Sequence, residues 1–393
     1  MLTTLAVQNY RSLRDLVLPL APLTLVTGPN GSRKSSLYRT LRMLADASRN
    51  GAVPALAREG GLLSTLWAGP ETVSRSVRQG RHPVQGTRRT QPVGLRLGFS
   101  GEEFGYALDL GLPMPDPDSA FQRDPEFKRE CLWTGTVLRT ARLLADRSGS
   151  TARTRDESGA WSGDTQSIRT TDSMLSELAD PRRSPELLVL RDRIRSWRFY
   201  DQFRTDAGAP ARATRVGTRT PVLGAEGADL AAALQTIREN GDAVALDEAI
   251  DSAFPGSRAE VAVHDGRFGL RFRQHGLLRP LDAAELSDGT LRYLLWVAAL
   301  LTPRPPELLV LNEPETSLHP DLLPSLAELI AAASTGAQII LVSHSVPLVR
   351  AVEAAAEHTG TRTGTVTLAK EFGDTVVEGQ GVLDRPAWHW PAR

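Results

Sequence analysis

The sequence predicts an α/β protein of 393 residues built around a phosphate-binding loop, and three observations support this prediction. A glycine-rich loop at residues 28–36 follows a short apolar run and precedes a helical pattern. Two further apolar runs, residues 307–311 and 338–342, are typical of buried parallel strands that end in polar side chains. Alternating apolar and polar residues at 94–99 and 103–110 favour an antiparallel sheet in the N-terminal part.

The glycine-rich loop is the first element to justify. Residues 23–27 are apolar and β-branched and predict a strand, whereas apolar residues after the loop fall on one helical face: Leu37, Tyr38, Leu41, Leu44 and Ala45. The loop matches the phosphate-binding pattern G-x-x-x-x-G-K-[ST] over these residues: Gly28, Pro29, Asn30, Gly31, Ser32, Arg33, Lys34, Ser35 and Ser36. A helix N-terminus attracts phosphate, Lys34 can reach the β- and γ-phosphates, and the Ser35 hydroxyl can ligate Mg²⁺.

Arg33 is the one departure from this pattern, because it stands where the last glycine is expected. The backbone passes close to the phosphates there, and a Cβ atom has little room. Three outcomes are open: the side chain leaves the pocket and ATP still binds, the guanidinium contacts phosphate, or the site is degenerate. Taken alone, the loop also fits an ordinary Gly/Asn/Ser turn between a strand and a helix.

Three motifs in the C-terminal part support the nucleotide interpretation. The sequence Ser-Asp-Gly-Thr at 287–290 precedes a helical pattern, with Ser287 as the predicted N-cap. The first C-terminal strand ends in Asn-Glu-Pro-Glu at 312–315, and the second ends in Ser-His-Ser at 343–345. The carboxyl ends of parallel strands meet at one edge of a sheet, so we expect these polar groups to gather there.

In this order the motifs resemble those of ABC-type ATPases of the RecF, SMC and OLD kind, which are often grouped as AAA-family ATPases. Residues 9–12 resemble their "NFRS" opening, 28–36 their Walker A loop, 287–290 their shortened signature, 312–320 their Walker B and D-loop, and His344 their switch histidine. The resemblance implies an ABC-type P-loop NTPase head with a mixed sheet, an antiparallel subdomain and a mostly helical insertion.

The resemblance also implies ligands and an assembly. ATP and Mg²⁺ would bind, and two heads would form an ATP-dependent homodimer. Ser287 and Gly289, at the start of the signature helix, would contact the γ-phosphate held by the opposite subunit. A transporter ATP-binding subunit fits the short signature less well, and a GTPase is disfavoured because no Asn-Lys-x-Asp motif occurs.

Catalytic roles follow from the same resemblance. Glu313 would polarise the attacking water, and His344 would hold that water or the γ-phosphate. Asn312 stands where many relatives place an Asp that binds Mg²⁺ through water; its amide oxygen lacks the charge and should hold the metal less firmly. The alternative interpretation makes Glu313 a surface turn acid and His344 a polar residue at a strand end. Gln79 and Gln85 are candidates for the glutamine loop.

Motif positions predict the organisation of the chain. Residues 1–145 would form the N-terminal half of the head, with the Walker A loop, and 256–393 the C-terminal half, with the signature, Walker B and switch histidine. The Ser/Thr/Gly/Arg-rich stretch 146–172 predicts a flexible loop. Residues 173–255 would form the helical insertion, and 261–272, broken at Asp-Gly, predict a hairpin.

Two absences narrow the function. The insertion has no sustained heptad pattern, which argues against a long coiled-coil arm of the SMC type. About fifty residues follow His344, and we expect no room there for the nuclease domain of OLD-type proteins. Any cleavage would then need a nuclease or effector partner in trans.

Charge and cysteine content leave the choice of partner open. The net charge is zero, yet the Arg-rich stretch 181–220 holds ten Arg against four acidic residues, with Trp197, Phe199, Tyr200 and Phe203 among them. Such a surface can meet DNA in repair or genome defence, although solvated arginines beside an aromatic core face fit equally. A single cysteine, Cys131, excludes an intrachain disulfide. With no apolar run long enough for a membrane helix, we expect a cytoplasmic protein without a membrane contact.

The two main alternatives differ in activity. The chain is either a working ATPase that dimerises on ATP, or a nucleotide-sensing interaction module that binds ATP weakly and hydrolyses little because of Arg33.

Overall fold

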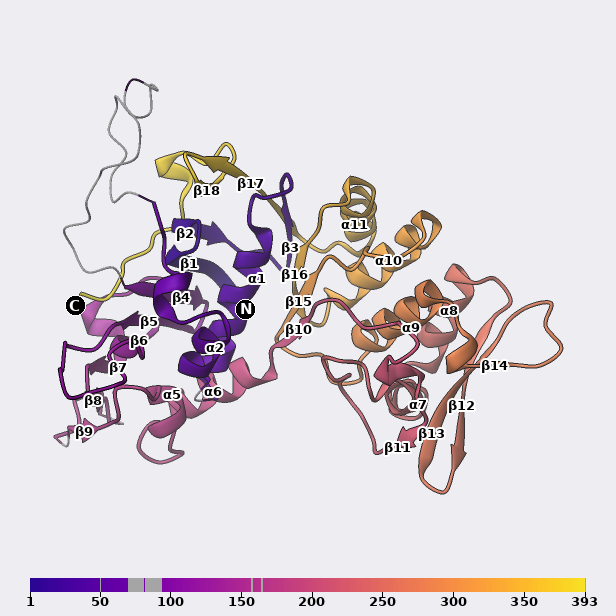
Figure 1. Ribbon diagram of the computed structural model, residues 1–393, viewed down its shortest axis with the longest axis horizontal. Coiled ribbons are helices and arrows are strands. Elements are labelled where there is room, and N and C mark those ends of the chain that lie inside the picture. Colours follow the sequence, from indigo (N-terminus) through magenta and orange to yellow (C-terminus); the bar gives the residue numbers. More distant parts are fainter. Residues whose placement is uncertain (50, 70–80, 82–93, 157, 164, 393) are drawn as a thin grey trace. The chain divides into compact units, whose positions relative to one another are not determined.

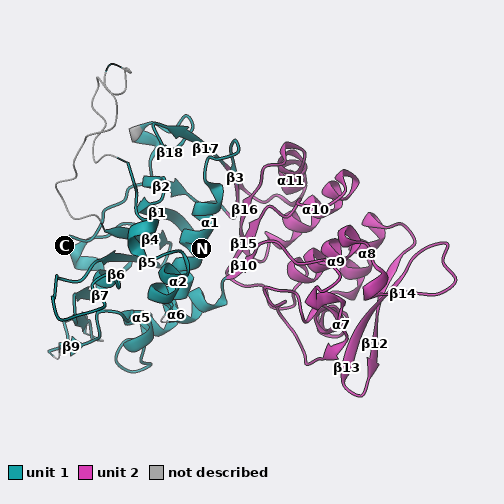
Figure 2. Ribbon diagram, in the orientation of Figure 1, with its two compact units in different colours: residues 1–21, 26–197, 366–393 teal, residues 22–25, 198–365 magenta. Residues whose placement is uncertain are grey.

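The computed structural model describes residues 1–49, 51–69, 81, 94–156, 158–163 and 165–392 (Figure 1). The glutamine-loop candidates Gln79 and Gln85 lie outside these residues. The described chain forms two compact units, which Figure 2 colours separately. Unit 1 holds residues 1–21, 26–197 and 366–393, and unit 2 holds 22–25 and 198–365. The unit limits thus fall at other positions than the expected limits after residues 145, 172 and 255.

Unit 1 is built on an antiparallel sheet. Eight of its described strands follow the order β2-β1-β4-β5-β6-β7-β8-β9, and neighbouring strands pair antiparallel throughout. The strands are β1 (Leu2–Tyr10), β2 (Leu13–Pro19), β4 (Leu95–Gly101), β5 (Phe104–Gly111), β6 (Glu126–Thr134), β7 (Leu143–Ser148), β8 (Thr151–Thr154) and β9 (Gln166–Ser167). The alternating patterns at 94–99 and 103–110 lie in β4 and β5, so the antiparallel prediction is confirmed.

Helices and a hairpin complete unit 1. The helices are α1 (Lys34–Ala47), α2 (Ala52–Arg58), α3 (Leu62–Thr65), α5 (Met174–Glu177) and α6 (Pro185–Ser196). The buried face of α1 includes the apolar residues that predicted it, among them Leu37, Leu41 and Leu44. Strands β17 (Thr363–Glu371) and β18 (Asp374–Val377) pair antiparallel; residues 366–371 of β17 and all of β18 belong to this unit.

The prediction of a flexible loop at residues 146–172 is wrong. They carry the end of β7 and all of β8 and β9. In β8, Ala152 and Thr154 are buried while Thr151 and Arg153 are exposed, which is the alternation of a half-buried strand. The composition hides this strand because its two buried residues are as small as typical loop residues.

Buried polar groups tie β6 to α5 in unit 1. Arg147 lies 3.2 Å from Glu130, and both side chains are fully buried. Glu130 also accepts from the Tyr106 hydroxyl (2.5 Å) and the Met174 backbone N–H (2.8 Å). Burial beside this carboxylate raises the pKa of Tyr106 well above its usual value.

Near its C-terminus the chain packs on the same unit. The Trp388 ring lies 5.6 Å from Trp133 and 5.2 Å from Trp390, and both tail tryptophans pack against the cluster around Cys131. Cys131 is a buried free thiol, and burial raises its pKa. In the part of the chain that the structure describes, no helix is long and apolar enough to cross a membrane.

Unit 2 is built on parallel strands that position the candidate site. Strands β10 (Arg198–Tyr200), β15 (Leu308–Asn312) and β16 (Gln338–Val342) are parallel neighbours. Strand β3 (Leu23–Thr27) begins beside β16, where Ile339 N–H donates to the Pro22 carbonyl (2.8 Å), and its last two residues belong to unit 1. Tyr200 pairs with Leu311 and Asn312 with Val342, so the residues that follow these strands lie at one sheet edge.

Helices and a small second sheet surround these strands. The helices are α7 (Leu230–Asn240), α8 (Ala243–Ala253), α9 (Asp288–Leu300), α10 (Leu323–Ala333) and α11 (Val346–Thr359). The second sheet contains β11 (Arg215–Val216), β13 (Arg267–Arg273), β12 (Arg258–His264) and β14 (Leu281–Asp282). The hairpin prediction is confirmed, since β12 and β13 are joined by Asp265 and Gly266, both with positive φ (47° and 71°), as a tight two-residue turn requires.

Candidate active site

The phosphate-binding loop lies in unit 1, between β3 and α1. Gly28 has φ +142°, and a Cβ atom there would stand 2.2 Å from the Leu368 carbonyl oxygen, so only glycine fits. Lys34 is buried, and its ammonium donates to the carbonyls of Gly28 (2.5 Å) and Pro29 (3.3 Å). The lysine is therefore held inside the loop, at its own backbone oxygens.

Arg33 takes a backbone conformation suited to the missing glycine. Its φ and ψ are 68° and 34°, in the left-handed region, and it forms the N-cap of α1 without a side-chain cap. The side chain is exposed. This exposure agrees with a side chain that leaves the pocket, which is the structural part of the first outcome considered above. Arginine in this left-handed conformation costs about 1 kcal/mol of backbone strain, and the cost does not come from steric crowding inside the loop.

Residues from the C-terminal part of the chain brace the same loop. The Thr375 hydroxyl donates to the Ser32 carbonyl (3.2 Å) and shares a hydrogen bond with the Ser12 hydroxyl (2.8 Å). All three residues are buried. The Ser32 hydroxyl is buried as well and has no hydrogen-bond partner among the described residues.

Glu313 and His344 meet in unit 2, as the sequence predicted for strands ending at one edge. The His344 Nε2 atom and the Glu313 Oε1 atom form a hydrogen-bonded contact. The Glu313 backbone N–H donates to the Val342 carbonyl (2.7 Å), which extends the β15–β16 ladder by one residue. Glu313 has φ +49°, a conformation uncommon outside glycine.

Glu315 holds the segment that carries His344, a role the sequence did not reveal. Its Oε1 atom accepts three hydrogen bonds, from the Ser343 hydroxyl (2.7 Å) and from the backbone N–H groups of His344 (2.9 Å) and Ser345 (3.1 Å). Its Oε2 atom is buried and, within the described part of the chain, has no partner. The carboxylate therefore orders the segment 343–345 that carries His344.

Asn312 is paired with an acidic residue that sequence reasoning also missed. Its side-chain amide donates to Asp201 Oδ1 (2.8 Å), and Asp201 directly follows β10. The Asn312 amide oxygen is buried without a partner in the residues described. The same described residues hold no group of three or more His, Cys, Asp or Glu able to bind a metal ion.

The signature forms the start of α9. Ser287 is exposed and caps the helix by accepting from the Thr290 N–H (3.1 Å), which confirms the predicted N-cap. Gly289 lies beside the D-loop, since a Cβ there would be 3.7 Å from the Ser317 carbonyl oxygen. Arg292 reaches the same loop through the Thr316 carbonyl (2.9 Å), and burial lowers its pKa.

The two halves of the expected site thus lie in different units. Residues 28–36, with the expected Mg²⁺ ligand Ser35, belong to unit 1, whereas Ser287, Gly289, Asn312, Glu313 and His344 belong to unit 2. Within unit 2 the structure brings together Glu313 with His344, and Gly289 with the D-loop.

The Arg-rich stretch 181–220 is divided between the units at residue 197. Three of its aromatic side chains, Trp197, Tyr200 and Phe203, are buried, which matches the interpretation as a core face. Several of its arginines are paired with acidic residues, for example Arg193 with Glu103 and Arg204 with Asp206. These three rings are therefore not available to stack on bases.

Comparison with known proteins agrees with these features. Residues 23–351, well over half of the chain, match the family described as "AAA domain, putative AbiEii toxin, Type IV TA system". A 44-residue segment is 46% identical to the OLD nuclease of Thermus scotoductus; it covers 11% of this chain and only 8% of that protein.

Solved structures resemble almost the whole chain. An SMC head bound to the C-terminal winged-helix domain of ScpA has a TM-score of 0.51 and 11% identity, over 97% of this chain and 98% of that one. The SMC head domain from Thermotoga maritima has a TM-score of 0.46 and 14% identity, over 97% and 99%. The first of these likenesses, together with the strand–loop–helix at residues 23–47, identifies a P-loop ATPase fold. The chain therefore belongs to this family of AAA-domain proteins, which its match over residues 23–351 shows.

Proposed function

We propose that this chain binds ATP with Mg²⁺, dimerises on it and hydrolyses it. The contact between Glu313 and His344 is the observation that carries the proposal. It joins a carboxylate to an imidazole at the edge of a parallel sheet, where α/β proteins bind their ligands. A carboxylate so placed can orient water, and the imidazole can hold the water or a phosphate oxygen.

Three buried polar atoms without protein partners fit the ligands of such a site. They are Ser32 Oγ in the phosphate loop and Asn312 Oδ1 and Glu315 Oε2 in unit 2, each so in the described part of the chain. A buried polar atom that is left unpaired costs about 1–3 kcal/mol, and a bound phosphate or a metal-bound water would remove that cost. Ser35 and Asn312 would hold Mg²⁺, which when bound neutralises the charge of the transferred phosphoryl group.

Lys34 and the start of α1 would supply the phosphate contacts. Lys34 already donates to loop carbonyls, and a phosphate oxygen is a stronger acceptor than a carbonyl for an ammonium. The α1 N-terminus has no side-chain cap, and the positive end of its helix dipole would attract the phosphate. Ser287, exposed at the start of α9, would contact the nucleotide of the second subunit.

DNA and a partner in trans extend the proposal. One relative is named a nuclease, and a fold relative was solved with a winged-helix domain, which supports a head that works with other proteins. We place the chain in DNA repair or genome defence, in the cytoplasm. Exposed arginines of the stretch 181–220, such as Arg182 and Arg219, would meet DNA phosphates, and binding should then weaken steeply as salt increases.

A second candidate function is favoured by Arg33. The left-handed arginine at the N-cap of α1 can weaken phosphate binding, which would leave a nucleotide-sensing module with little turnover. One substitution distinguishes the two candidate functions. If Arg33→Gly creates turnover that the native chain lacks, the sensing module is the right description.

The deciding experiment compares ATP binding and phosphate release for the native chain, Glu313→Gln and Arg33→Gly, with and without DNA. We expect Glu313→Gln to bind ATP normally and to lose about 100-fold or more of its turnover, because the general base is neutralised. Glu357→Gln, an exposed residue on α11, is the matched control. Robust native turnover that Glu313→Gln leaves unchanged would exclude the catalytic assignment.

A further inference from the structure

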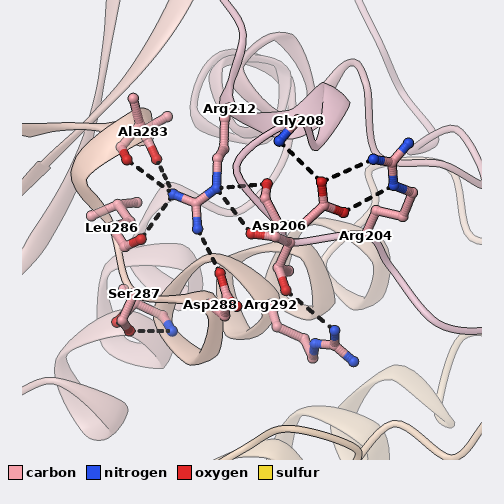
Figure 3. A network of polar contacts seen from close by, with 12 residues as sticks. Arg204, Asp206, Gly208, Arg212, Ala283, Leu286, Ser287, Asp288 and Arg292 are labelled. Carbon is pink, nitrogen blue, oxygen red and sulfur yellow. Dashed lines mark hydrogen bonds and ion pairs between the residues drawn. The ribbon is translucent and has the colours of Figure 1, made fainter.

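Arg212 reaches the signature from a distant part of the chain. It ends a short 3-10 helix (Pro210–Arg212), and its side chain is only 9% exposed. One guanidinium nitrogen, Nη1, donates to the carbonyls of Ala283 and Leu286, both at 2.8 Å. The other, Nη2, donates to Asp288 Oδ1 at 2.7 Å. Figure 3 shows the guanidinium between these groups, with Ser287 beside them.

The third nitrogen fixes the arginine itself. Nε donates to the carbonyls of Thr205 (2.9 Å) and Asp206 (3.1 Å), in the segment that follows β10. Arg212 therefore bonds on one side to the segment after β10 and on the other to the signature. Its charge is largely enclosed by protein oxygens, which makes it a poor contact for a nucleic acid.

We infer that Arg212 is a positioning residue that presents Ser287 to the nucleotide of a second subunit; the inference rests on the proposed ATP-dependent dimer. The bonds to Ala283 and Leu286 fix the backbone before Ser287, and the bond to Asp288 fixes it after. Ser287 stands between the two anchors, exposed and already at the helix N-terminus. The planar guanidinium can donate to the two carbonyls and to the Asp288 carboxylate at once, whereas a lysine ammonium cannot match that geometry.

This arrangement predicts a separation of two properties. The bonds of Arg212 go to residues 205–206 and 283–288 rather than to the residues proposed to hold ATP in the same chain, so binding of ATP to the monomer should not depend on Arg212. Dimerisation should depend on it, because a loosened signature loses order just where the second nucleotide must be met. A residue that only stabilised the fold would lower both properties together.

The test uses the full chain in a Glu313→Gln background, which should retain ATP. Dimerisation with Mg²⁺ and ATP is measured by sedimentation, and ATP affinity of the monomer by titration, for Arg212→Lys and Asp288→Asn. Arg204→Lys is the matched control, since Arg204 lies in the same segment and pairs with Asp206 on the surface. We expect Arg212→Lys to weaken dimerisation about tenfold or more with ATP affinity unchanged, and the control to behave like the parent.

Asp288→Asn covers the case in which Arg212→Lys folds poorly. It keeps the carbonyl anchors and removes only the charge, and should weaken dimerisation by a smaller factor at unchanged ATP affinity. A parent that dimerises together with variants that dimerise equally well overturns the inference alone. Parallel losses of ATP affinity and dimerisation in both variants also overturn it. A parent that binds ATP yet stays monomeric overturns the proposed dimer, and the inference with it.

Discussion

The side-chain amide of Asn312 donates a 2.8 Å hydrogen bond to Asp201 and so joins the ends of two adjacent parallel strands. Its nitrogen is used in this bond, and its oxygen is buried without a partner among the described residues. Asp201 is exposed, so the pair sets an exposed carboxylate beside a buried amide.

Asn312→Asp should make the stability of the protein depend on metal. Two carboxylates at hydrogen-bond distance repel each other, so in chelator we expect the variant to be less stable than the native chain by about 1–2 kcal/mol. Mg²⁺ with ATP should recover that loss. Melting temperatures with EDTA and with Mg²⁺ and ATP test this. The double variant with Asp201→Asn should lose the effect, and a single variant as stable as the native chain in EDTA would contradict it.

Glu315→Ala should damage both stability and turnover. Three donors lose their common acceptor, and two of them are backbone N–H groups, so we expect a loss of about 2–4 kcal/mol in unfolding free energy. Turnover should fall because His344 is no longer held. Glu313→Ala is the contrast: it should abolish turnover with little change in stability. Denaturant unfolding and phosphate release are measured on both variants. A Glu315→Ala chain of native stability would refute the role of Glu315 in holding the segment 343–345.

Gly28→Ala and Gly31→Ala should differ although both positions belong to the same loop. A Cβ at Gly28 meets the Leu368 carbonyl at 2.2 Å, and the backbone must move, so we expect a loss of about 2 kcal/mol or more together with weaker ATP binding. At Gly31 a Cβ meets no atom within 4 Å among the described residues, and only its φ of +82° opposes alanine, at about 1 kcal/mol. Equal losses in urea unfolding would contradict this difference.

Alkaline pH should unfold the protein through its buried tyrosines. Burial raises the pKa of Tyr10, Tyr106, Tyr200 and Tyr293 above the usual value of 10.0. Since the folded state favours the neutral phenol, their contribution to stability is complete below pH 10 and is lost as pH rises above it. Ultraviolet titration should show these tyrosines ionising together with the loss of circular dichroism. Ionisation near pH 10 in a chain that stays folded would count against it.

Local signals in the sequence predicted much of the fold. Strand β16 covers the predicted residues 338–342, and Ser287 caps α9 as its residue type suggested. Apolar runs and helix caps depend on residues that are close in sequence, so they can be recognised without the structure. Strand β8 could not be recognised, because its two buried residues, Ala152 and Thr154, are as small as typical loop residues.

Contacts between residues distant in sequence could not be predicted from local patterns. Asp201 and Asn312 are 111 residues apart, and Glu315 and Ser343 are 28 apart. No periodicity links such pairs, and only the parallel pairing of β10, β15 and β16 brings them together. The sequence could indicate which groups gather at the strand ends, but not which of them bond.

Thr375 and Leu368, which enclose the phosphate loop, have a consequence for the order in which the protein is made. A ribosome completes residues 28–36 early, yet the hydroxyl that holds Ser32 and the carbonyl that confines Gly28 come more than three hundred residues later. In a nascent chain the loop therefore lacks its contacts with Leu368 and Thr375. The same holds for any chain truncated before residue 368. A motif that emerges early is thus completed late, which would tie the proposed nucleotide binding to synthesis of the C-terminal hairpin β17–β18.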